Sequence, residues 1–156
     1  MFKKILIPLD GSRLSTKTIP YAIEIAGKFD SEVAMLRVVK QTNPVVSGGP
    51  TEIGGPADIK LEMQIALQQD MKNTLAARRY LQRQSRKLKN KGIKSFYKVI
   101  LGTPAHSIAT FCHKEHIDLV IMTTHGKSGF KRAILGSVSD EVVRQSGVPV
   151  LLIKSR

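Results

Sequence analysis

This sequence of 156 residues contains one cysteine, Cys112, and therefore cannot form an internal disulfide. A chain with so little cysteine is expected in a reducing compartment. The sequence also lacks any apolar run approaching the roughly 20 residues that span a bilayer. Its N-terminal apolar run is too short for a secretory signal peptide, since Asp10 follows at once. We therefore predict a cytoplasmic protein without a membrane segment.

Acidic residues are scarce as well: 12 stand against 25 lysines and arginines, for a net charge of +13. No acidic residue lies between Met71 and Lys114. The basic residues of this block, at 72–98, are Lys72, Arg78, Arg79, Arg83, Arg86, Lys87, Lys89, Lys91, Lys94 and Lys98. Such a block is either a contact for nucleic acid, anionic lipid or an acidic partner, or a solvated helix face that keeps the protein soluble.

Apolar segments alternate with helical patterns along the whole chain. Strands are predicted at residues 4–9, 32–39, 95–101, 118–123 and 148–153, and helices at 12–28, about 58–90, 103–115 and 131–145. This alternation predicts a single α/β domain over residues 1–156, with a parallel five-stranded sheet and helices on both faces. In such sheets, ligands bind beyond the carboxyl ends of the strands.

The segment from residue 41 to residue 90 is unusual. Residues 41–56 contain four glycines and three prolines, which predicts a loop. The helical pattern that follows has an apolar residue at every fourth position from Ile59 to Leu75. A continuous helix of this length would measure about 50 Å, longer than the domain itself. We expect it to start late, to kink or to protrude.

Two small-residue segments after the fourth strand are suited to phosphate binding. Gly126 and Gly129 allow backbone N–H groups to approach an anion, and Gly136 with Ser137 adds a second such turn, where a helix N-terminus would favour negative charge. The alternative is a loop that only connects strand to helix. A P-loop is excluded, because its first glycine would fall at Ile121, inside the predicted strand.

Asp10 directly follows the first strand. Its carboxylate can accept from ribose hydroxyls or hold a divalent cation, and the alternative role is to start the turn or cap the next helix. His113 and His116 are spaced like metal ligands, but no second cluster completes a zinc site.

These segments resemble the universal stress protein family over nearly the whole chain, residues 41–90 excepted. The resemblance is carried by residues 3–12 (KKILIPLDGS), 35–39 (MLRVV), 102–105 (GTPA) with Ile108, and 117–122 (IDLVIM). Gly126, nine further residues and Gly136-Ser137 match the pattern of the ATP-binding members. Thr123 stands where that pattern has its first glycine.

The resemblance implies a Rossmann-like fold of the adenine nucleotide alpha hydrolase type, and a role for each matching residue. Pro8, Leu9 and Asp10 would line the nucleoside side, with Asp10 near the ribose or a Mg²⁺ ion, and the Val38 backbone would face the adenine edge. The sugar and phosphates would be approached by Thr123, His125 and Gly126, and the phosphates held by Gly136, Ser137, Val138 and Ser139. The resemblance also implies a homodimer formed through the last strand, residues 149–153.

The leading hypothesis is thus a stress-response or regulatory protein, without catalytic residues, that binds ATP or AMP, with or without Mg²⁺. One alternative is a slow ATP hydrolase. Another is a basic interaction protein that has lost nucleotide binding and works through residues 72–98.

Overall fold

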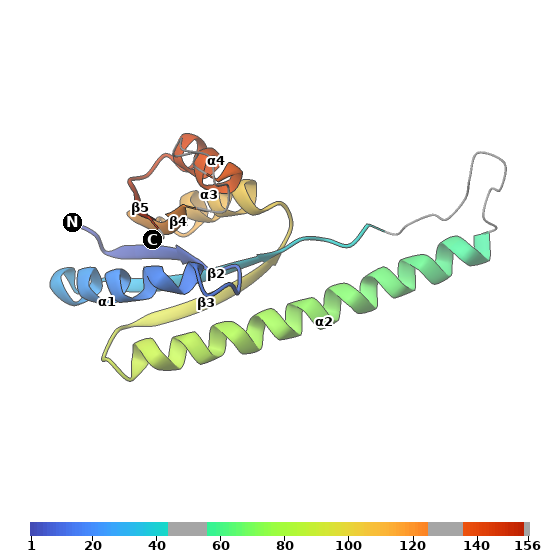
Figure 1. Cartoon of the computed structure of the whole chain (residues 1–156), viewed down its shortest axis with the longest axis horizontal. Coiled ribbons are helices and arrows are strands. Elements are labelled where there is room, and N and C mark those ends of the chain that lie inside the picture. The colour runs from blue at the N-terminus through green and yellow to red at the C-terminus, as the bar shows by residue number, and fades with distance from the viewer. Residues whose placement is uncertain (44–55, 125–135, 155–156) are drawn as a thin grey trace.

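The strands form one parallel sheet. The computed structural model describes residues 1–43, 56–124 and 136–154 (Figure 1). Its strands are β1 (Lys4–Pro8), β2 (Glu32–Val39), β3 (Ser95–Leu101), β4 (Leu119–Thr124) and β5 (Val150–Lys154). They lie in the order β3-β2-β1-β4-β5, and every neighbouring pair is parallel. The predicted fold class is confirmed, with strand bounds that differ from the prediction by at most two residues.

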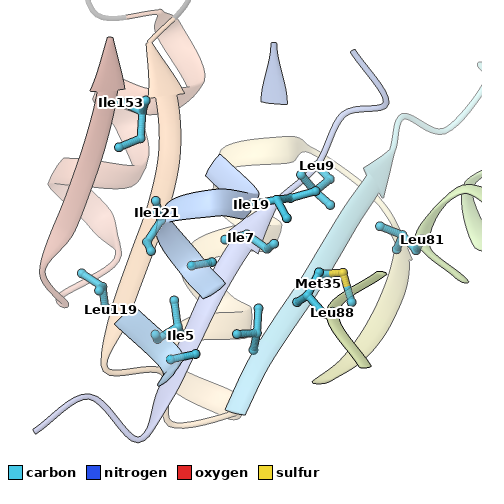
Figure 2. Packing of buried hydrophobic residues seen from close by; sticks show 13 residues of the cluster. Ile5, Ile7, Leu9, Ile19, Met35, Leu81, Leu88, Leu119, Ile121 and Ile153 are labelled. Atoms are coloured by element: carbon cyan, nitrogen blue, oxygen red, sulfur yellow. The ribbon is translucent and has the colours of Figure 1, made fainter. Parts of the chain in front are cut away.

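Helices cover both faces of this sheet. They are the 3-10 turn η1 (Ser15–Lys17) and the helices α1 (Thr18–Phe29), α2 (Pro56–Lys89), α3 (Pro104–Lys114) and α4 (Ser137–Gln145). Side chains alternate along β1, so Ile5 and Ile7 pack under α1 and α2 while Leu6 packs under α3 and α4. Figure 2 shows the first of these two cores. Burial on both faces explains why the central strands β1 and β4 are almost continuously apolar.

The first helix begins later than predicted. The sequence predicted a helix from residue 12, whereas the structure has a turn, then η1, and α1 only from Thr18. The Ser12 hydroxyl accepts the N–H of Ser15, the first residue of the 3-10 turn, at 3.1 Å. A helix was also predicted from residue 131. Its described part, α4, begins at Ser137, and residues 131–135 lie outside the described ranges.

The long helix α2 protrudes. It has 34 residues without interruption, and its N-terminal half extends past the end of the sheet (Figure 1). Its C-terminal half buries Ala77, Leu81 and Leu88 completely, whereas Leu67 is 61% exposed. The chain leaving β2 runs beside it, where the Thr42 N–H donates to the Asp70 carboxylate at 2.9 Å. Of the three expectations for this helix, protrusion is the one that is observed.

Candidate functional site

A cavity of about 250 Å³ opens at the carboxyl ends of the strands. It lies where β1, β2 and β4 end and where α3 and α4 begin. Its volume is close to the lower end of small-ligand pockets, roughly 300 Å³. The twelve described residues that line it are Pro8, Leu9, Asp10, Ser15, Leu36, Val38, Pro104, Ile108, Met122, Thr123, Val138 and Ser139.

The turn after β1 forms one wall of the cavity. The Leu9 N–H donates to the Leu36 carbonyl at 2.8 Å, which holds the chain against β2 one residue beyond the strand. Asp10 then accepts the N–H of Ser12 at 2.9 Å and starts a tight turn. Gly11 has a φ of +86°, and a Cβ at this position would lie 2.4 Å from the Arg37 guanidinium. The positive φ favours glycine here, whereas the Arg37 guanidinium is the end of a flexible side chain and could move aside.

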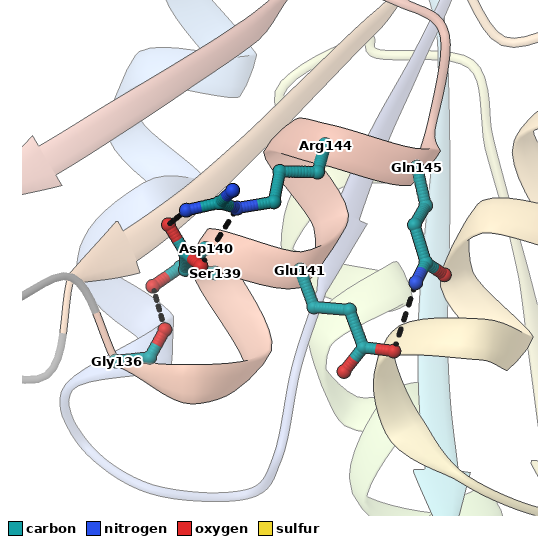
Figure 3. A network of polar contacts seen from close by, with 6 residues as sticks. All are labelled: Gly136, Ser139, Asp140, Glu141, Arg144 and Gln145. Carbon is teal, nitrogen blue, oxygen red and sulfur yellow. Dashed lines mark hydrogen bonds and ion pairs between the residues drawn. The ribbon is translucent and has the colours of Figure 1, made fainter.

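The opposite wall is the start of α4. Gly136 is the N-cap, and its carbonyl accepts the Ser139 hydroxyl at 2.8 Å (Figure 3). The same carbonyl accepts the Asp140 N–H at 2.9 Å. Because glycine has no side chain, this N-cap does not itself cap the first-turn N–H groups. Asp140 is paired with Arg144 at 3.0 Å. The first turn therefore presents backbone donors and a partial positive charge.

The helix α3 begins at the same cavity. Pro104 is its first residue, with the preset φ that suits this position. Pro104 and Ile108 are four residues apart and line the cavity with one helix face. Two helix N-termini, those of α3 and α4, thus converge on one cavity and favour an anionic ligand.

The lining is mostly apolar, and Asp10 is the one ionisable side chain among the described residues that form it. The hydroxyls of Ser15, Thr123 and Ser139 are the other polar side-chain groups there, and Thr123 and Ser139 are nearly fully buried. Apolar walls with few polar groups are typical of sites for small organic ligands. The described part of the lining contains one carboxylate and three hydroxyl groups, and no histidine or cysteine.

The cavity brings together seven of the residues that the sequence assigned to the site: Pro8, Leu9, Asp10, Val38, Thr123, Val138 and Ser139. Gly136 and Ser137 precede Val138 on the same turn but do not line the cavity. His125 and Gly126 lie outside the described residues, so their predicted roles stay predictions.

Five lining residues were missed by sequence reasoning: Ser15, Leu36, Pro104, Ile108 and Met122. One of them had a usable signal, since Leu36 is two residues before Val38 and so shares its face of β2. Ser15 is brought to the site by the turn that follows Asp10, which the sequence presented as part of a regular helix.

Metal-binding groups are sparse in the described ranges. Residues 1–43, 56–124 and 136–154 contain no cluster of three histidine, cysteine or acidic side chains. Cys112 is fully buried in α3, and burial raises the pKa of its thiol to about 11. In the described ranges, Asp10 is therefore not part of a cluster of three possible metal ligands. It fits a magnesium ion that takes its remaining ligands from phosphates and water, as magnesium commonly does.

Comparison with known proteins identifies the family. The family model of the Universal stress protein family matches residues 1–154. This chain belongs to the universal stress protein family. Universal stress protein MJ0531 of Methanocaldococcus jannaschii is 34% identical over 154 residues, which cover 99% of this chain and 83% of that protein.

Solved structures of universal stress proteins and their relatives share the fold. The structure of MJ0577, also from Methanocaldococcus jannaschii, superposes with a TM-score of 0.79 at 27% identity, over 100% of this chain and 98% of that one. A family member from Arabidopsis thaliana, solved with AMP bound, superposes with a TM-score of 0.62 at 16% identity, over 99% and 92% of the two chains. At that identity the likeness shows the fold alone.

No helix in the described ranges is both long and apolar enough to cross a membrane. This holds for α2 too, whose 34 residues include many charged side chains.

Proposed function

We propose that this universal stress protein binds an adenine nucleotide in the cavity at the carboxyl ends of β1, β2 and β4. The observation that carries the proposal is the convergence of two helix N-termini on a mostly apolar cavity with one carboxylate at its rim. An adenine ring suits the apolar walls formed by Leu36, Val38 and Ile108. The Asp10 carboxylate suits ribose hydroxyls, and the N-terminal turn of α4 suits phosphate.

The bound nucleotide is ATP or AMP in this proposal. AMP is bound by the Arabidopsis family member, which shares the fold. ATP adds two phosphates, which would extend toward the start of α4; the family pattern also assigns His125 and Gly126 to the sugar and phosphates. With ATP, Asp10 would hold a magnesium ion together with the phosphates. Such an ion would neutralise phosphate charge and fix the phosphate conformation.

The protein acts as a regulatory module rather than as an enzyme in this proposal. A slow ATP hydrolase is the alternative. It is distinguished by measuring phosphate release from ATP with the parent and with Asp10→Ala. Turnover above the buffer rate that the substitution abolishes would favour the enzyme.

Isothermal calorimetry with AMP, ATP and UMP tests the binding proposal. The cavity-filling variant Val38→Trp should lose AMP binding, because an indole occupies much of a cavity of about 250 Å³. Val143→Trp is the matched control, because Val143 is 44% exposed on α4 and does not line the cavity. Saturable AMP binding by the parent and by Val143→Trp is expected. Equal AMP binding by both variants would show that the nucleotide does not bind in this cavity.

Two further parts of the proposal concern partners and location. Strand β5 lies at an edge of the sheet, paired with β4. Its backbone groups on the other side can pair with a second copy, and we propose a homodimer through residues 149–153. The cytoplasm is the proposed location, on the composition of the sequence.

A further inference from the structure

The N-terminal half of α2 carries a row of apolar side chains that face solvent. Five of them recur at every fourth residue: Ile59, Met63, Leu67, Met71 and Leu75, which are 41%, 53%, 61%, 65% and 50% exposed. Side chains four residues apart on a helix form a continuous ridge. We call this row the α2 ridge. A contiguous exposed apolar patch of several hundred Å² is often functional.

The ridge is exposed because α2 is longer than the sheet that supports it. A helix of 34 residues is about 50 Å long, whereas the seven residues of β3 span about 23 Å. The C-terminal half of α2 packs on β2 and β3, and the N-terminal half extends beyond them (Figure 1). Helices in proteins are stabilised mainly by packing of an apolar face. A partner surface on the ridge would supply that packing to the projecting half.

We propose that the partner is a second copy of this chain, whose own α2 ridge packs against the first in antiparallel orientation. The ridge is symmetric about Leu67: Met63 and Met71 lie four residues away on either side, and Ile59 and Leu75 lie eight. A two-fold axis beside Leu67 therefore sets Leu67 against itself and Met63 against Met71 of the second copy, and Ile59 and Leu75 flank this centre about 80° around the helix. Ridges of this spacing pack into the grooves of a facing helix in the commonest class of helix pairs.

The charges along α2 select the antiparallel orientation. The segment 58–75 carries three carboxylates and two lysines, so two copies of it do not repel each other strongly. The following segment is strongly basic, and parallel helices would set two such segments side by side. Antiparallel helices centred on Leu67 instead hold the two Arg79 residues roughly 36 Å apart along the helix axis. That separation is several times the screening length of about 8 Å in physiological salt.

The size of the ridge is consistent with a weak, reversible association. Its five side chains expose about 500 Å² per copy, so a pair can bury at most about 1,000 Å², the lower limit for a specific interface. This interface is separate from the β5 edge and does not depend on nucleotide. A chain with both interfaces would assemble into tetramers or longer species.

Disulfide trapping of the full-length protein tests the proposal. With Cys112→Ala as background, Leu67→Cys should form an intermolecular disulfide in mild oxidant. Packed helices about 8–10 Å apart bring the two Cα atoms into disulfide range. Ile65→Cys is the matched control: Ile65 is 57% exposed but lies on the opposite side of the helix from the ridge. It should stay monomeric on a non-reducing gel.

Light scattering at several concentrations provides an independent readout. Leu67→Lys should lower the largest observed mass by at least half, and Ile65→Lys should leave it unchanged, with circular dichroism showing that both variants fold. Absence of the cross-link in Leu67→Cys, equal cross-linking in Ile65→Cys, or an unchanged mass for Leu67→Lys would overturn the proposal.

Discussion

The Asp10 carboxylate provides the most discriminating prediction about the site. Replacing Asp10 with Asn removes one negative charge and keeps the shape of the side chain, whereas Ala removes both. If Asp10 accepts the ribose hydroxyls, the lost interaction is a hydrogen bond to a charged group, with a net contribution of about 1.5–3 kcal/mol. AMP affinity should then fall about 10- to 150-fold in Asp10→Ala. The fall should be smaller in Asp10→Asn, whose amide oxygen still accepts.

The structure predicts only a small accompanying loss of stability. Asp10 is exposed and accepts the Ser12 N–H at 2.9 Å, so its removal should lower the free energy of unfolding by about 0.5–1 kcal/mol. Calorimetry with AMP, without magnesium, measures the affinity, and urea unfolding measures the stability. Asp30→Asn is the charge-matched control, since Asp30 is exposed and pairs with Lys94 at 3.3 Å, away from the cavity. AMP affinity equal to that of the parent in Asp10→Ala would refute the assigned role.

Three other groups yield predictions. Thr123→Gly should tighten AMP binding by about 1 kcal/mol, because it restores the glycine of the family pattern, and weaker binding would show that the threonine hydroxyl contacts the ligand. Cys112 should react with a thiol reagent at pH 8 far more slowly in the folded protein than in urea, because its pKa of about 11 leaves about 0.1% thiolate; equal rates would contradict its burial. A fluorescent DNA duplex should bind weakly and with strong salt dependence if the basic block is a nucleic-acid contact. That binding should disappear when three exposed residues of α2 are changed together to Glu, namely Arg79, Arg83 and Arg86, and equal binding by both proteins would leave the block as a solvated face.

Much of the fold could be predicted from the sequence, because its strands are mostly apolar and its central strands are buried. The mostly apolar runs 32–39 and 95–101 match β2 and β3 residue for residue. The turn from Asp10 to Ser15 was harder. There the side chains of Asp10 and Ser12 accept backbone N–H groups, so the regular helix begins only at Thr18. The apolar spacing of a helix does not reveal such side-chain hydrogen bonds to the backbone.

The family resemblance identified the site residues that carry its motifs, and the apolar lining was missed. Asp10 directly follows the end of β1, and Ser139 lies in the first turn of α4. Ile108 and Met122 belong to the apolar patterns of α3 and β4, in which a cavity-lining residue has the same sequence signature as a core residue. The direction taken by α2 was likewise open, because apolar spacing alone does not tell a helix that is covered from one that projects.

The nucleotide site itself is tested most directly by NMR titration of the ¹⁵N-labelled protein with AMP. Saturable shifts are predicted for the amides of Leu9, Val38 and Ser139, which come from three separate elements and meet only at the cavity. Amides at the far end of the sheet, such as that of Ser95, should not move. No shift at millimolar AMP, or shifts confined to the basic face of α2, would contradict the assignment of the cavity as an adenine nucleotide site.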